Sequence, residues 1–164
     1  MSNSVFAIKK KLLTSDRDRF FNCIIDFVFI LVIIFFFTLF VVITGNILQW
    51  DIYRMWEEIL IKLGLFGTYF SFATVYYFTF ESLFGRTLGK MMTGSIVITE
   101  YGLKPDFMVI FKRTLCRFIP FDALSFLGES GRMWHDSLSR TYVVEKNVLE
   151  EEIKLQELNL IGTE

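Results

Sequence analysis

Two long apolar stretches dominate the pattern of hydrophobic and polar positions along the chain. In the first, residues 20–45, the only formal charge is Asp26, and in the second, residues 59–80, the only one is Lys62. A bilayer core about 30 Å thick requires roughly 20 apolar residues in a helix. The pattern therefore predicts two membrane-spanning helices over about these ranges, joined as a transmembrane hairpin.

The chain after the second stretch lacks the pattern of a third span. The run "SIVIT" at residues 95–99 is typical of a short strand. In "FMVIFKRTLCRFI", apolar positions alternate with Lys112, Arg113 and Arg117. This predicts an interfacial segment within about residues 106–128, an amphipathic helix whose basic face lies against lipid headgroups. A shallow re-entrant element around "FIPFDALSFLG" is the alternative.

These elements define an all-α membrane protein in three parts. A basic N-terminal segment covers residues 1–18, and a membrane domain covers residues 19–145. An acidic tail at 146–164 is expected to form a short helix. The predicted fold is a two-span hairpin with a cytoplasmic-side amphipathic or re-entrant segment and one short strand-like element.

The first span carries a polar stripe at its N-terminal end. At 3.6 residues per turn, one helix face contains the following residues: Arg19, Asn22, Cys23 and Asp26. A charge at the centre of a membrane helix costs roughly 2.5–3.5 kcal/mol, so Asp26 is expected to face protein or water. Three roles are open for Asp26: it fixes helix packing through Thr, Tyr or Arg neighbours, it handles protons or ions, or it binds a ligand.

The second span offers a surface that could face this stripe. Its small residues form a helix-packing face: Gly64, Gly67, Thr68 and Ser71. In an antiparallel hairpin, Thr74 is expected at about the depth of Asp26, with Glu81 nearer the cytoplasm.

Charge decides the orientation and excludes one class of partner. The chain is 53% hydrophobic with a net charge of −1, so nothing draws it to nucleic acid. Lysine and arginine cluster before the first span and after the second, and are sparse between them. The positive-inside rule then predicts a multi-pass protein of the cell (inner) membrane with both termini cytoplasmic. Anionic lipid headgroups on that side are expected partners.

The chemistry-bearing residues do not form a catalytic or metal-binding pattern. Cys23 and Cys116 lie far apart in the chain, and His135 is the only histidine, so no metal site and no cofactor is predicted. The segment "GRTLGKM" lacks the glycine spacing and the hydroxyl residue of a phosphate loop. No nucleophile accompanies His135 and Asp136, and no enzyme activity is expected.

Three segments together resemble the RDD family of small integral membrane proteins, which is named for one arginine and two aspartates. "RFFNCIID" is similar to the first signature, "GRTLGKMMTGSIVIT" to the segment after the second span, and "GRMWHDSLSRTYVV" to the closing signature. The resemblance covers roughly residues 17–145. It implies that Arg19, Asp26 and Asp136 are the signature residues, and it leaves the molecular activity open.

Combining the resemblance with the polar stripe gives one hypothesis about the site. Arg19, Asp26 and Asp136 are expected to form one cluster on the cytoplasmic side, structural or ion-coupling. The supporting residues are Asn22, Thr74, Glu81, Arg86, Lys90, Arg117 and His135. The expected function is a non-enzymatic accessory or assembly subunit that binds another membrane protein. The alternative is a homo-oligomeric transporter or ion- or proton-coupled exchanger that uses Asp26.

Overall fold

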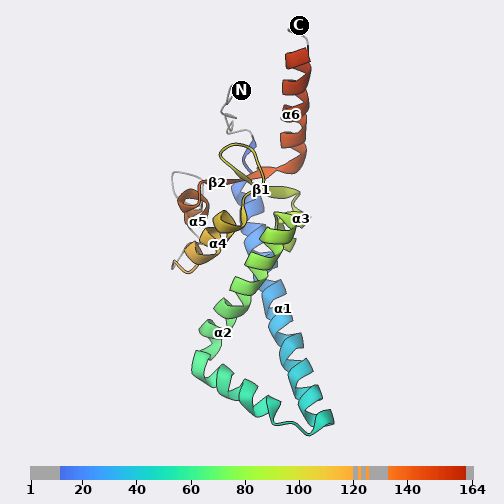
Figure 1. Cartoon of the computed structure of the whole chain (residues 1–164), viewed down its shortest axis with the longest axis vertical. Helices are drawn as coiled ribbons and strands as arrows, with labels where there is room; N and C mark the ends of the chain where they lie inside the picture. Colours follow the sequence, from blue (N-terminus) through green and yellow to red (C-terminus); the bar gives the residue numbers. More distant parts are fainter. Residues whose placement is uncertain (1–11, 120–121, 123–124, 126–132, 162–164) are drawn as a thin grey trace.

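The computed structural model describes residues 12–119, 122, 125 and 133–161 of the 164-residue chain. Two helices of 33 residues each, α1 (Asp16–Leu48) and α2 (Ile52–Phe84), form a long hairpin (Figure 1). The hydroxyl oxygen of Ser15 caps α1 by accepting a hydrogen bond from the backbone N–H of Asp18. Both predicted spans lie inside these helices, which extend beyond them at each end.

The hairpin is pinned by aromatic packing at two levels. Toward the end of the hairpin where α1 begins and α2 ends, a buried cluster joins Ile30 of α1 to Ala73 and Tyr76 of α2. Further along, the indole N–H of Trp56 donates to the Thr38 hydroxyl at 3.2 Å, and its ring packs edge-on against Phe37. Between these two levels the helices diverge, as Figure 1 shows.

The divergence has its origin at Gly64, which interrupts α2. Its φ of 65° and ψ of −179° are not helical, and a side chain rarely adopts such a conformation. The Thr68 hydroxyl donates to the Gly64 carbonyl at 2.8 Å and so supplies one hydrogen bond at the break. The helix consequently consists of two arms that meet at an angle (Figure 1).

A small mixed domain, here called the head, closes the other end of the hairpin. It comprises α3 (Leu88–Met92), β1 (Ser95–Thr99), α4 (Phe107–Cys116), α5 (Trp134–Leu138) and β2 (Thr141–Glu145), followed by α6 (Lys146–Ile161). The strands pair antiparallel, with Val97 opposite Val143. The strand expected at residues 95–99 and the helix expected in the tail are present, whereas β2 was not predicted.

The two faces of this sheet serve different purposes because strand residues alternate in direction. On one face, Ile98 and Val144 pack with Leu12 and with Leu149 of α6 into a hydrophobic core. On the other face, Ser95, Thr141 and Val143 are buried toward the helices of the head. That second face supplies hydroxyl groups to the polar site described below.

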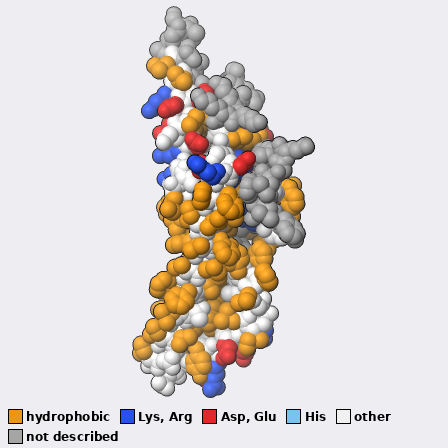
Figure 2. Space-filling view, turned by 180° about the vertical axis from the view of Figure 1, so that it is seen from behind, with side chains coloured by type: hydrophobic (Ala, Val, Ile, Leu, Met, Phe, Trp, Pro, Cys, Tyr) orange, Lys and Arg blue, Asp and Glu red, His pale blue; other side chains and the backbone are white. Residues whose placement is uncertain are grey.

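The surface of the hairpin is strongly apolar. In the described part of the chain, α1 and α2 are long and apolar enough to cross a membrane, and little of either span is buried within the molecule. Figure 2 shows hydrophobic side chains covering the hairpin between a charged tip and the head, where charged side chains gather. This is the surface of a protein whose solvent is lipid.

The small-residue packing face predicted on the second span is wrong. Nothing lies within 4 Å of where a Cβ at Gly64 would be, and a Cβ at Gly67 would meet only Leu63 of its own helix. Ser71 is exposed and bonds to the Gly67 carbonyl. Thr68 is the only member of the set that is buried. Aromatic side chains fill the hairpin instead, and they hold the two backbones apart.

Candidate functional site

The buried carboxylate of Asp26 is fully occupied by donors from α2 and α3. The Tyr76 hydroxyl donates to Oδ1 and the Thr87 hydroxyl to Oδ2, each at 2.7 Å, and the Gly89 backbone N–H donates to Oδ1 at 2.9 Å. The Tyr76 oxygen in turn accepts from the Leu88 N–H at 3.1 Å. Asp26 therefore joins α1 to the segment that follows α2.

Gly89 makes this joint possible because α3 lies directly on α1. A Cβ at this position would come within 2.5 Å of the Asn22 carbonyl oxygen and 2.9 Å of the Asn22 Cα. These are backbone atoms that cannot move aside as a side chain can. The close approach of two backbones that was expected at residues 64–71 is found here instead.

A second buried carboxylate, Glu81, collects three cations. It accepts from Lys90 Nζ at 2.7 Å, from Arg117 Nη2 at 2.8 Å and from Arg113 Nε at 3.1 Å. Arg113 is 0% exposed and continues the network, because its Nη1 also bonds to Asp136 and to the Thr141 hydroxyl. The network thus links α2, α3, α4, α5 and β2.

His135 connects the last two acids of the site. Its Nδ1 lies 2.5 Å from one oxygen of Asp122, and its Nε2 lies 3.2 Å from Asp136 Oδ1. Its backbone N–H also donates to Asp122 at 2.8 Å. The imidazole thus lies between two carboxylates and links α5 to Asp122.

Charge compensation sets the protonation states in the head. Burial alone would raise the pKa of Asp136, but Arg113, His135 and Lys90 hold it well below its ordinary value. Burial lowers the pKa of Lys90, which Glu81 partly offsets. Burial would also lower the pKa of Arg113, yet Glu81 and Asp136 raise it. The network is therefore a set of paired ions.

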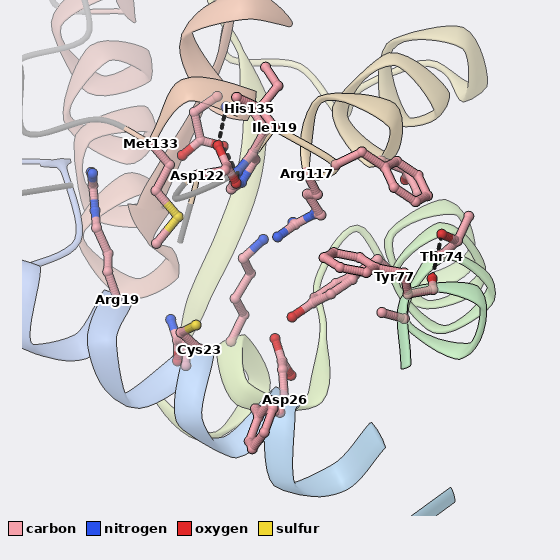
Figure 3. A pocket seen from close by; sticks show the side chains of 18 of the residues that line it. Arg19, Cys23, Asp26, Thr74, Tyr77, Arg117, Ile119, Asp122, Met133 and His135 are labelled. Atoms are coloured by element: carbon pink, nitrogen blue, oxygen red, sulfur yellow. Dashed lines mark hydrogen bonds and ion pairs between the residues drawn. The ribbon is translucent and has the colours of Figure 1, made fainter. Parts of the chain in front are cut away.

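A cavity of about 400 Å³ lies beside these ions, between α1, α2, α4 and α5. Its polar wall is formed by Arg19, Asp26, Lys90, Arg117, Asp122, His135 and Asp136. Its apolar wall is formed by residues of the two spans, among them Phe27, Tyr69 and Phe70. Figure 3 shows the guanidinium of Arg117 pointing from α4 into the cavity, where it stacks over the Tyr77 ring at 4.0 Å.

The three signature residues thus share one cavity wall while belonging to different hydrogen-bonded groups. Asp26 bonds to α2 and α3, and Asp136 bonds to Arg113 and His135. Arg19 is buried at the start of α1, where its Nε donates to the Thr14 carbonyl at 3.1 Å. The cluster inferred from sequence is a cavity lined by these residues, in which the carboxylates have separate partners.

The supporting residues are placed unevenly around that cavity. Asn22 accepts from the Thr93 hydroxyl at 2.8 Å, and Glu81, Lys90, Arg117 and His135 are in the ion network. Thr74 lines the same cavity as Asp26, as its expected depth implied, but its hydroxyl bonds to the Phe70 carbonyl of its own helix and Tyr76 supplies the bond to Asp26. Arg86 makes no ion pair with any residue that the structure describes.

Arg113 was expected on a lipid-facing basic surface, and its place in the ion network was not predicted. That assignment is wrong for Arg113 and Arg117, because both turn inward to Glu81, and only Lys112 of the three is exposed. One signal in the sequence pointed inward: Arg113 is three residues after the buried Ile110, on the same helix face. The re-entrant alternative, around residues 118–128, falls mostly outside the described residues.

Replacing Asp26 by asparagine is expected to lower the free energy of unfolding by about 1.5 kcal/mol. An amide keeps the shape but loses the charge that strengthens three hydrogen bonds. The measurement is the unfolding midpoint of the purified protein in mild detergent. Asp51→Asn is the matched control, since Asp51 is exposed at the hairpin tip and should shift stability by less than about 0.5 kcal/mol. Equal stability of Asp26→Asn and wild type would contradict a packing role.

The donor set does not favour metal chemistry. Over the described ranges, no group of three or more His, Cys, Asp or Glu side chains is placed to hold a metal ion. The acids of the head are each paired with a cation or with hydroxyl and amide donors, and a metal would have to displace them. The arrangement can hold helices together and can present unused donors to a ligand in the cavity.

Comparison with known proteins relates this chain to a protein family. The family model described as the RDD family matches residues 14–149, which include both long helices, the sheet and all three signature residues. No curated protein and no solved structure matches the chain.

Proposed function

This chain belongs to the RDD family and is a membrane protein with two candidate spans, and from that premise we propose that it is a non-enzymatic accessory or assembly subunit of a larger complex in the cell (inner) membrane. In this proposal both termini are cytoplasmic and the head faces the cytoplasm. The basic residues that flank the spans support that orientation. Another membrane protein packs against the hairpin.

The observation that carries the proposal is the break in α2. At Gly64 the helical backbone is interrupted, and the two residues that follow, Leu65 and Phe66, are 90% and 83% exposed. Irregular backbone at membrane depth is tolerated where protein buries it or where it lines a water-filled cavity, because lipid offers no hydrogen bonds. The bend therefore calls for a protein partner.

The polar residues of the spans support an assembly role over conduction by one chain. Asp26 is engaged by three donors, and the buried face of α1 continues from it as Ile30 and Val41, both apolar. A polar route would need groups that continue past Asp26. Within the described part of a single hairpin, the buried α1 face offers no such continuation.

The cavity favours one alternative, a homo-oligomeric transporter or ion-coupled exchanger. Seven ionisable side chains besides Cys23 and the tyrosines, including Asp26 and His135, line a space next to the spans. One of these side chains could bind and release a proton or an ion if a second copy of the chain supplied the rest of a polar route. This alternative places another copy of the chain, rather than a different subunit, against the bend.

The two proposals are separated by photo-cross-linking followed by intact-complex mass determination. A photoreactive phenylalanine analogue at Phe66 is expected to join the chain to a different membrane protein, in a fixed stoichiometric ratio. The matched control is the same analogue at Phe36, which is 61% exposed on α1 and should react with lipid only. Cross-links at Phe66 only between copies of this chain would overturn the accessory proposal and favour transport.

A further inference from the structure

Two cavities in the hairpin share one wall, and their polarity changes from one to the other. The polar-walled cavity of about 400 Å³ adjoins a second one of about 650 Å³, and both are lined by Phe27, Tyr69 and Phe70. The second cavity is otherwise formed by apolar side chains and by Thr38, Gly64 and Thr68. Both volumes lie in the range of small-molecule sites.

The pair of cavities is charged at one end and apolar at the other, in the same order as the headgroup and acyl chains of a lipid in the adjacent leaflet. Along α1 the wall runs from Arg19 and Asp26 through Phe27 to Leu31, Ile34 and Thr38. Asp26 and Thr38 are about 18 Å apart along the helix axis, at about 1.5 Å per residue. The charged end is formed by residues of α1 and of the head, as Figure 3 shows for Arg19, Asp26 and His135, and the apolar end is formed by residues of the two candidate spans.

At the charged end, hydrogen-bond donors remain unused while the acceptors are satisfied. Asp26 has three donors, Glu81 has three, and Asp122 has two. The Arg117 Nε, in contrast, is buried and has no hydrogen-bond partner among the residues that the structure describes, although the guanidinium lines the cavity. A guanidinium nitrogen without an acceptor is costly in a dry site and selects for an anion.

Two further cations line the same cavity, and the three acids that line it with them already accept hydrogen bonds from protein donors. Lys90 lines the same cavity, and its ammonium has three hydrogens, whereas Glu81 is its one hydrogen-bond acceptor in the described part of the chain. Arg19 lines the cavity from α1. A phosphate oxygen in this space would lie beside the Arg117 guanidinium and the Lys90 ammonium, and a small turn of the Arg117 side chain would let its buried Nε donate as well.

We propose that this pair of cavities binds one anionic phospholipid, with its phosphate beside Arg117 and Lys90 and an acyl chain along Phe27, Tyr69 and Phe70. The chain continues against the α1 wall of the second cavity. The phosphate end uses groups that the proposed partner does not contact, whereas the second cavity is also lined by Gly64, Leu65 and Phe66, where the partner is proposed to pack. The lipid supplies an acceptor beside Arg117 and occupies the two cavities that the aromatic side chains of the hairpin leave open.

The test is a lipid titration of the purified, delipidated protein in mild detergent, read by native mass spectrometry. Wild type is expected to bind one phosphatidylglycerol at least tenfold more tightly than phosphatidylcholine with the same acyl chains. Arg117→Gln should lose this preference. Lys112→Gln is the matched control, since Lys112 is exposed on the same helix outside the cavity, and it should keep the preference.

An uncharged variant keeps the test decisive if Arg117→Gln unfolds. Thr74→Phe places a ring in the cavity without touching the ion network, because the Thr74 hydroxyl bonds only to its own helix. It should weaken the binding of both lipids at least tenfold while the unfolding midpoint stays near that of wild type. Unchanged lipid binding by a folded Thr74→Phe variant would overturn the proposal.

Three other outcomes would also overturn it. Equal affinity of wild type for the two lipids would remove the role of the phosphate site in selecting an anion. An equal loss in Lys112→Gln and Arg117→Gln would assign the preference to the surface charge of the head. Displacement of phosphatidylglycerol by glycerophosphoglycerol at the same concentration would show a headgroup site in which the acyl chain contributes nothing.

Discussion

Replacing Arg113 by methionine is expected to lower the free energy of unfolding by about 3–5 kcal/mol, a large part of the stability of a domain of this size. Arg113 is fully buried and pairs with Glu81 of α2 and with Asp136 of α5. Methionine fills much of the volume but leaves both carboxylates with fewer counter-charges, and a buried unpaired charge is what makes breaking such a pair costly.

The neighbouring Lys112 provides the control, because it is a cation on the same helix that faces outward. Lys112→Met is expected to change stability by less than about 0.5 kcal/mol. Unfolding in detergent, followed by circular dichroism, measures both variants. If Lys112→Met were as destabilising as Arg113→Met, the two residues would act alike at the lipid surface, and the buried network would lose its assigned role.

A double variant separates the ion pair from simple packing. Because Glu81→Gln removes the carboxylate that Arg113 faces, its combination with Arg113→Met should be less destabilising than the sum of the two single changes. A coupling of about 1–3 kcal/mol is expected for residues in one network. Additive effects would mean that Arg113 contributes by filling space.

Gly89→Ala is expected to destabilise the protein by about 3 kcal/mol although it adds only one methyl group. The new Cβ would lie 2.5 Å from the Asn22 carbonyl oxygen, so α3 would have to move away from α1. Overpacking of this kind costs about 1–3 kcal/mol. The movement also weakens the hydrogen bond from the Gly89 N–H to Asp26, at 2.9 Å.

Gly67→Ala is the matched control for this change. Gly67 lies inside α2 and its Cβ would meet the Leu63 side chain, at 3.1 Å from the Leu63 Cβ, where only side-chain atoms have to yield, so the loss of stability should be clearly smaller than for Gly89→Ala. Thermal unfolding in detergent compares the two variants. A destabilising Gly67→Ala together with a neutral Gly89→Ala would mean that helices approach closely at Gly67 and not at Gly89, as the sequence pattern first indicated.

The signature residues acquire distinct tasks in the folded protein. Asp26 ties α1 to α2 and α3, Asp136 ties α5 to α4, and Arg19 holds the start of α1 against the Thr14 carbonyl. The family resemblance marked these three positions without indicating what they contact. Arg113, which the signature does not include, is the residue that joins Asp136 to Glu81.

The hydrophobic pattern by itself determined the two spans, the polar face of α1 and the strand at residues 95–99. These are local features: a helix repeats every 3.6 residues, a strand every two, and a membrane span needs a minimum apolar length. The same local reasoning placed Asp26 on a buried face, where the structure also has it. It further showed that the acidic tail could form the helix α6.

Only the tertiary structure decided which groups meet. Glu81 and Arg113 are 32 positions apart, and Asp26 and Gly89 are 63 apart, so no periodicity links them. The direction in which Arg113 and Arg117 face depends on the acids that α2 and α5 bring to α4. The local pattern around residues 107–119 predicted that those arginines face lipid headgroups, because Glu81 lies too far away in the chain to be part of that pattern. The cavity beside Arg117 likewise follows from how the head closes on the hairpin.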